Sequence, residues 1–210
     1  MRARFIEHLG RIKADIRDII ERDRIAVQAF VEDIEEQKIR PIAEVQQYEE
    51  ETHRLLKETE HSIMMLILRQ QPVADDLHAL TTSMAMHRDL ARIAIQATES
   101  ERLWHQVPAA ERNQPLLLEM GQQVLRMVIA LEMAYMQPTV AEIRQIIAMD
   151  DVIDDLFLKV KMQVVENIQG GNVNFSAQLD IVFISKYFEK MGDHLSAVAR
   201  HELRLLEKEW

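Results

Sequence analysis

The 210-residue sequence has no cysteine, only 5 glycines and 5 prolines, and few aromatic residues. Without cysteine the chain can form neither disulfides nor thiolate metal sites, and an intracellular setting fits best. No apolar run approaches the ~18 residues that a membrane-spanning helix needs. Because glycine and proline disfavour helices most strongly, their scarcity favours long helices with few breaks.

Positive charge is also in short supply. The chain carries 25 Lys and Arg against 35 Asp and Glu, a formal net charge of -10. Such a chain repels a phosphate backbone, which argues against general nucleic-acid binding, and it favours cations or basic protein surfaces as ligands. The sequence also lacks a glycine-rich phosphate loop, a His-Glu-x-x-His zinc motif and the context of a serine or cysteine nucleophile. We therefore expect a protein that is not an enzyme.

The residues that are abundant favour an all-α fold. Hydrophobic residues make up 48% and charged residues 29% of the chain, which is typical of globular proteins. Apolar residues recur every three or four positions, as in the amphipathic helices of bundles. In the first half this pattern predicts helices over about 5–34, 42–69 and 74–104, with breaks at Pro41 and Pro72. Acids of the first helix, including Asp23, are expected on exposed faces beside Lys and Arg.

The second half repeats this organisation. The segment 107–114 loses the apolar pattern and is followed by helices over about 116–136, 139–168 and 175–210, the last two separated by a glycine-containing break at 169–172. We therefore predict two tandem three-helix bundles, residues 1–106 and 107–210, related by internal duplication.

Two acidic pairs stand out in the second half. Glu189 and Asp193 are four residues apart, so on a helix both carboxylates project from one face, where like charges destabilise the helix unless a cation or donor lies between them. Gly192, a poor helix former, lies beside this pair. Asp150 and Asp154 form a second pair on the preceding helix, at the flank of its core face.

Side by side in a bundle, the two pairs would place four carboxylates around one shallow pocket. Oxygen ligands from facing helices suit Fe, Mn, Mg or Ca, and helical bundles hold carboxylate-bridged metal clusters. His194 is a candidate for an additional ligand or for a residue that orients one. The competing interpretation is that these acids are ordinary solvated surface.

Four segments resemble motifs of the PhoU family, bacterial regulators of phosphate uptake. They are Phe188-Glu189-Lys190-Met191-Gly192-Asp193-His194, similar to (hydrophobic)-E-R-[IM]-G-D-H; Asp150-Asp151-Val152-Ile153-Asp154, similar to D-x-x-[VI]-D; Arg69-Gln70-Gln71-Pro72-Val73-Ala74-Asp75-Asp76-Leu77, similar to R-Q-x-P-[VT]-A-x-D-L-R but with His78 in place of the last Arg; and Arg4-Phe5-Ile6-Glu7-His8-Leu9, similar to the N-terminal start of the family. The resemblance covers essentially the whole chain.

The resemblance implies two homologous bundles side by side, with multinuclear iron or zinc clusters held by acidic motifs such as Asp150, Asp154, Glu189 and Asp193. It implies a cytoplasmic protein that acts at the inner face of the cell membrane through its partners. Those partners are the ATPase subunit of the Pst phosphate ABC transporter, which it restrains, and the sensor kinase PhoR, to which it relays phosphate sufficiency. We also expect a homodimer.

The first half departs from the family pattern. Where the family has E-R-I-G-D, this chain has Ala91-Arg92-Ile93-Ala94-Ile95, so both carboxylates are absent. Its companion pair reads Glu49 and His53, which are weaker candidates because no acidic helix would face them. Asp89 is expected to be a lone solvated or capping acid. We therefore expect one cluster, in the C-terminal bundle, and a metal-free N-terminal bundle whose surface closes with the small apolar residues Ala91, Ala94 and Ile95.

Two other functions stay open. The first is an accessory subunit of another phosphate carrier. The second is a di-iron carboxylate oxidase of the ferritin-like kind, which normally needs E-x-x-H motifs on two core helices. The acids of this sequence lie off the core faces, which argues against that enzyme.

Overall fold

The computed structural model describes residues 2–171 and 173–208, and within them the chain forms helices and no β-strand. In chain order these are α1 (Arg2–Glu35), α2 (Ile42–Gln70), α3 (Asp75–Trp104), the 3-10 helix η1 (Ala109–Glu111), α4 (Pro115–Tyr135), α5 (Val140–Ala148), α6 (Asp150–Gly170) and α7 (Phe175–Glu207). The predicted all-α fold of two tandem three-helix bundles is confirmed. In the part of the chain described, no helix is long and apolar enough to span a bilayer.

The helix ends follow local signals in the sequence. Pro41 precedes α2, and Pro115 is the first residue of α4, where its missing N–H costs nothing. Thr139 caps α5 in a reciprocal capping box with Glu142. Gly171 ends α6 with φ of 80°, a conformation that glycine adopts without strain. Of the predicted break at 169–172, Asn172 lies outside the described residues, as do residues 209–210 of the last predicted helix.

One predicted helix is divided. The stretch 139–168 was expected to be continuous, but α5 ends at Ala148 and α6 begins at Asp150. Between them the N–H of Met149 donates to the carbonyl of Ile146, three residues back instead of four, at 3.1 Å. This tight turn makes Asp150 the first residue of a new helix, where free N–H groups favour a carboxylate.

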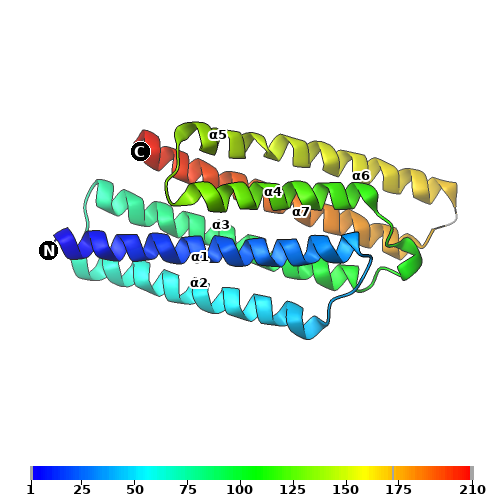
Figure 1. Ribbon diagram of the computed structural model, residues 1–210, viewed down its shortest axis with the longest axis horizontal. Coiled ribbons are helices and arrows are strands. Elements are labelled where there is room, and N and C mark those ends of the chain that lie inside the picture. The colour runs from blue at the N-terminus through cyan, green and yellow to red at the C-terminus, as the bar shows by residue number, and fades with distance from the viewer. Residues whose placement is uncertain (1, 172, 209–210) are drawn as a thin grey trace.

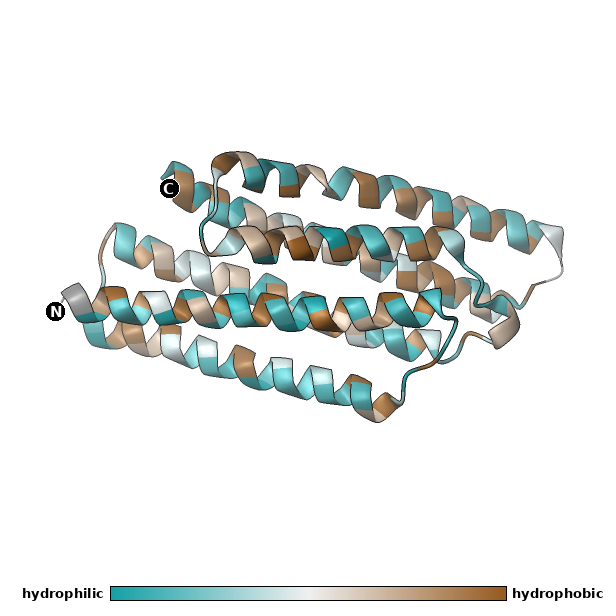
Figure 2. Cartoon of the chain, viewed as in Figure 1, coloured by the Kyte–Doolittle hydropathy of each residue, from teal (hydrophilic) through white to brown (hydrophobic). Residues whose placement is uncertain are grey.

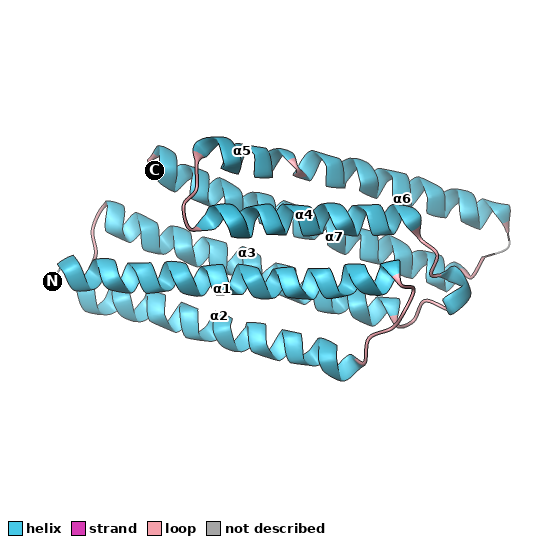
Figure 3. Cartoon of the chain, in the orientation of Figure 1, coloured by secondary structure: helices cyan, strands magenta, loops and turns pink. Residues whose placement is uncertain are grey.

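The two halves lie side by side along their full length (Figure 1). Helices α1, α2 and α3 form one bundle, and α4, the α5–α6 pair and α7 form the other. Figure 3 colours the described residues as helix or loop, with no strand among them. Contact between the halves runs mainly through α3 against α7 and through α1 against α4. As a result α2 and the α5–α6 pair lie at opposite edges of the molecule.

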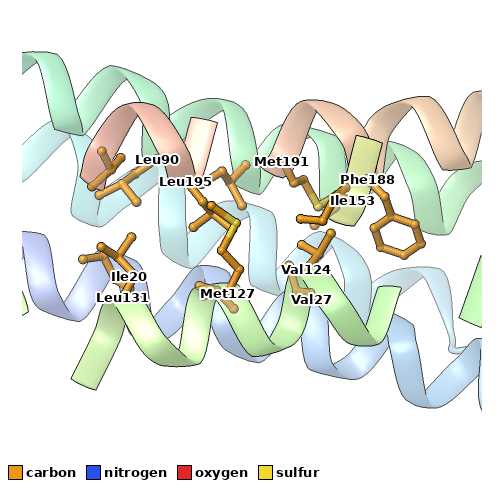
Figure 4. Close-up of a cluster of buried hydrophobic side chains, with 14 of the residues drawn as sticks. Ile20, Val27, Leu90, Val124, Met127, Leu131, Ile153, Phe188, Met191 and Leu195 are labelled. Atoms are coloured by element: carbon orange, nitrogen blue, oxygen red, sulfur yellow. The ribbon is translucent and has the colours of Figure 1, made fainter. Parts of the chain in front are cut away.

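A single hydrophobic core joins the halves. In Figure 4, Ile20 and Leu90 of the first half meet Met127, Leu131 and Leu195 of the second. Figure 2 shows the hydrophobic bands recurring along every helix, as the apolar period requires. Because α1, α3, α4 and α7 all contribute buried side chains, the core cannot be divided into two separate ones.

The core also encloses acids that the sequence analysis assigned to the surface. Asp23 is fully buried on α1, not exposed as expected, and neither of its carboxylate oxygens has a hydrogen-bond partner. Burial raises its pKa well above the ordinary value. The reason is its register: Asp23 follows the buried Ile20 by three residues and precedes Val27 by four, so it belongs to the apolar face.

Candidate functional site

The two acidic pairs of the second half meet where α6 packs against α7. The helices are antiparallel, and Gly192 of α7 lies against the start of α6: a β-carbon on this glycine would be 2.7 Å from Asp150 Oδ1 and 3.0 Å from Ile153 Cδ1. Any larger residue would push the Asp150 carboxylate away. The glycine beside the acidic pair therefore permits the close approach of the second pair.

The four carboxylates act on one another electrostatically. Asp150 is 8% exposed, and its burial, with the nearby charges of Asp193 and Asp154, raises its pKa to about 6. Partial burial, followed by Glu189 and Asp193, also raises the pKa of Asp154. The neighbouring hydroxyl of Ser196 opposes this rise in the pKa of Asp150, but no hydrogen bond of normal geometry satisfies the buried Asp150 Oδ1. A buried, unpaired oxygen among like charges leaves a cation as the fitting addition to this cluster.

Two lysine side chains of α7 partly neutralise the negative charge of this cluster. Lys186 Nζ lies 2.7 Å from the Glu189 carboxylate, and Lys190 contacts both Glu189, at 3.4 Å, and Asp193. Within the described residues no three acids or histidines surround a common point as metal ligands do. The lysine side chains are 40–43% exposed, so both can swing outward and release the carboxylates. The oxygen donor set thus suits a hard cation once the lysines move.

His194 does not join this cluster. Its Nδ1 is 2.9 Å from Asp89 Oδ1, and His201 Nε2 is 3.5 Å from Asp89 Oδ2. Although partial burial opposes it, hydrogen bonding by the two histidines lowers the pKa of Asp89 to about 2. The expectation that Asp89 is a lone solvated or capping acid is therefore wrong. Asp89 instead links α3 of the first half to α7 of the second.

This link is expected to stabilise the protein. An acid whose pKa falls on folding, here from 3.8 to about 2, contributes stability above pH 3.8 that is lost as the pH falls through 2. We expect Asp89→Asn to lower the free energy of unfolding by about 1 kcal/mol at pH 7, and by nothing below pH 2. Urea unfolding at both pH values measures this, with the exposed Asp18→Asn as control. Equal losses at the two pH values would contradict the link.

The corresponding surface of the first half is different. Glu49 is paired with Arg102 of α3 at 2.8 Å, and Arg102 also contacts Glu99. His53 lies exposed beside it. The surface was expected to close around Ala91, Ala94 and Ile95, but a groove of about 580 Å³ runs between α2 and α3 at this place. The small alanine side chains do not fill the space between the helices, and Ile95 stays 46% exposed.

Sequence reasoning missed the Asp89–His194–His201 contact, although a signal was present. His194 and His201 are seven residues apart, so they lie on the same side of α7, two turns apart. This side faces α3. What the sequence could not supply was the register of α3 against α7, because that register is set by packing between residues about a hundred positions apart.

Comparison with known proteins gives the family. The model of the PhoU domain matches the chain twice, over residues 16–100 and 117–201. A protein of Clostridium acetobutylicum named phosphate-specific transport system accessory protein PhoU homolog is 24% identical over 154 residues, which cover 71% of this chain and 70% of that protein. A protein of Thermotoga maritima, named phosphate-specific transport system accessory protein PhoU homolog 1, is 23% identical over 193 residues, which cover 90% of this chain and 83% of that protein.

Solved structures share the fold. The crystal structure of the phosphate transport system regulatory protein PhoU from Streptococcus pneumoniae superposes with a TM-score of 0.77 over 99% of this chain and 95% of that one, at 14% sequence identity. At this identity the match bears on the fold alone. It agrees with the six-helix duplication predicted from the apolar pattern.

Proposed function

The chain belongs to the PhoU family, and from that premise we propose that it is a regulatory accessory protein that restrains phosphate uptake. The observation that carries this proposal is the double match of the PhoU domain, once in each half and over most of both. The relatives are named as accessory or regulatory proteins of phosphate transport, so the proposal includes no catalytic step.

The proposed mechanism is docking through helix faces. The partners are the ATPase subunit of the Pst transporter, whose activity the protein would hold down when phosphate is sufficient, and the sensor kinase PhoR. The proposed location is the cytoplasm, at the inner face of the membrane through these partners. Long rigid helices with a shared core suit this role, because they present fixed surfaces to partners.

Capture from membrane fractions tests the partners. The tagged chain, added to membranes of phosphate-rich and phosphate-starved cells, is expected to recover the Pst ATPase subunit and PhoR, with more recovered under phosphate excess. Recovery of a different phosphate carrier would favour the accessory subunit of another carrier. Recovery of none of these would contradict the proposal.

We further propose that Asp150, Asp154, Glu189 and Asp193 hold a multinuclear iron or zinc cluster, with manganese, magnesium or calcium as alternatives. A bound cation would neutralise the cluster and join α6 to α7. In this proposal Asp150 offers a buried oxygen without a hydrogen-bond partner, Gly192 allows its close approach, and the partly exposed Lys186 and Lys190 turn away from the carboxylates. The proposed working form is a homodimer.

Metal content after desalting tests the cluster. The chain stripped with a chelator and reloaded with iron or zinc is expected to retain metal and to unfold at a higher temperature. Glu189→Gln/Asp193→Asn is expected to weaken metal retention by at least about tenfold, because two of the four oxygen donors lose their charge. The matched control is Glu49→Gln/His53→Ala in the first half. Metal that survives the first pair of changes, or is lost with the second, would place the site elsewhere.

A further inference from the structure

The outer side of α6 carries a row of exposed apolar side chains. Leu158 is 55% exposed, Met162 65% and Val165 47%. Their spacing of four and three places them on one face of the helix, opposite the buried Val160 and Val164. We call these three residues the α6 ridge. An edge helix normally turns polar residues outward, so a helix that is apolar on both faces lacks a partner on one of them.

Helix α7 extends this apolar surface. Phe175 is 59% exposed and Leu179 40%. Asn167 of α6 donates to Gln178 of α7 at 3.2 Å, so Val165 and Leu179 lie at the same level of the antiparallel pair. With about half of each side chain exposed, the five residues present on the order of 400 Å², the size of patch that marks interaction sites on monomers. A stable interface buries about 800 Å² per subunit around such a centre.

Charged residues beside the ridge are complementary to those of a second copy of the same helix. Lys159 and Glu166 are seven residues apart, so they occupy the same flank of α6, two turns apart. Both are exposed, and among the described residues neither forms an ion pair. When two identical helices pack antiparallel, positions on this flank face one another across the two-fold axis. Each lysine would then meet a glutamate.

We propose that the α6 ridge is the interface of a two-fold symmetric homodimer, in which the two α6 helices pack antiparallel about an axis near Met162. Leu158 then packs against Val165 of the partner subunit. Lys159 pairs with Glu166 of the partner subunit, and the symmetry repeats this pair. The inference rests on the homodimer proposed above and adds its interface.

A second copy fits this surface better than a membrane does. Residues 156–170 hold two lysines and one glutamate, a net charge of +1 in a chain of -10. Its small net charge adds little repulsion between two copies, and its lysine and glutamate can pair across the two-fold axis. An anionic lipid surface would in turn be repelled by Asp151, Asp154 and Asp155, which directly precede this stretch on the same helix.

Sedimentation of the full chain in EDTA, over about 1–100 µM, tests the interface through charge reversal. We expect the chain to dimerise in this range, and Lys159→Glu or Glu166→Lys to weaken dimerisation about tenfold, because each change makes both symmetric pairs repulsive. The double change Lys159→Glu/Glu166→Lys restores opposite charges and is expected to restore dimerisation to within about threefold. Met162→Glu is expected to weaken it about a hundredfold, because two charges would be buried at the axis.

Met133→Glu is the control, since Met133 is 81% exposed on α4, away from the ridge. It is expected to leave dimerisation unchanged, and circular dichroism verifies that every variant keeps its helices. A dimer that survives Met162→Glu, or a double change that fails to restore it, overturns this interface but leaves the homodimer proposal intact. A chain that stays monomeric at 100 µM overturns both.

Discussion

Replacing Phe188 with alanine is expected to lower the free energy of unfolding by about 4 kcal/mol, at the upper end for a single core substitution. Phe188 is fully buried on α7, and its ring stacks on Phe30 of α1 with centroids 5.5 Å apart. A β-carbon on Gly121 of α4 would lie 2.9 Å from Phe188 Cζ, so the ring rests directly on that helix. The ring therefore fills a space bounded by three helices that cannot easily collapse.

The loss follows from two terms. Burial of a phenylalanine side chain is worth about 2–3 kcal/mol of transfer free energy, and the residual cavity adds to it. Phe30 also packs edge-on against Trp104, with centroids 6.3 Å apart, so removal of Phe188 disturbs one side of a three-ring cluster. Since Phe30 and Trp104 belong to the first half and Phe188 to the second, both halves lose stability together.

Urea unfolding followed by circular dichroism measures this effect. An unchanged slope of the unfolding free energy against urea concentration would show that the variant and the unchanged chain expose the same surface on unfolding. Phe183→Ala is the matched control, because Phe183 lies five residues earlier on the same helix and is 55% exposed. Its loss should stay below about 1 kcal/mol. Equal losses for the two variants would mean that the shared core is not formed as described. Two separate transitions in Phe188→Ala would show halves that unfold independently.

The helices could be predicted because their signals are local. The three- and four-residue apolar spacing places α1, α2, α3, α4 and α7 and joins α5 to α6, and Pro41, Pro115 and Gly171 mark ends within one or two residues. The break at Met149 was missed because a single residue with helical dihedral angles, φ of -67° and ψ of -22°, leaves no gap in the apolar pattern. Local rules describe the helices well and their small interruptions poorly.

Contacts between helices depend on register, which the sequence does not give. The antiparallel pairing of Asp150 with Gly192 could be anticipated from two adjacent helices joined by a short turn. The pairing of Asp89 with His194 could not, since it joins residues 105 positions apart. The ion pairs of Lys186 with Glu189 and of Lys190 with Asp193, in contrast, are local, because each joins residues three positions apart on α7. The candidate acids were found from sequence, and their neighbours from the structure.

The burial of acidic residues is another feature that the composition of the sequence does not reveal. At the far end of the first bundle, Asp33 is fully buried and accepts a hydrogen bond from Arg40 Nη2 at 3.0 Å. Glu101 of α3 is only 4% exposed, and its Oε2 has no hydrogen-bond partner. Asp33 is thus paired with Arg40 and, at 3.8 Å, with Lys38, whereas Glu101 forms no ion pair among the described residues. Burial, followed by the charge of Asp33, raises the pKa of Glu101 to about 8, against the opposing charges of Arg40 and Lys38.

Glu101 should therefore make the protein less stable as the pH rises. A group whose pKa is raised on folding, here from 4.5 to about 8, contributes stability that is complete below pH 4.5 and is lost as the pH rises through 8. We expect the chain to lose about 3 kcal/mol of unfolding free energy between pH 5 and pH 9 from this group, because the charged form of Glu101 is buried away from water and repelled by Asp33. Glu101→Gln cannot ionise and removes this loss.

The measurement is urea unfolding of the unchanged chain and of Glu101→Gln at several pH values from 5 to 9. The difference in unfolding free energy between Glu101→Gln and the unchanged chain is expected to grow with pH in favour of the variant. The exposed Glu60→Gln serves as control, because a solvated carboxylate gives a difference that does not vary with pH over this range. A pH-independent difference for Glu101→Gln would mean that Glu101 is ionised throughout. The positive charges of Arg40 and Lys38 would then offset the negative charges of Asp33 and Glu101, and this group would contribute the same stability at every pH in the range.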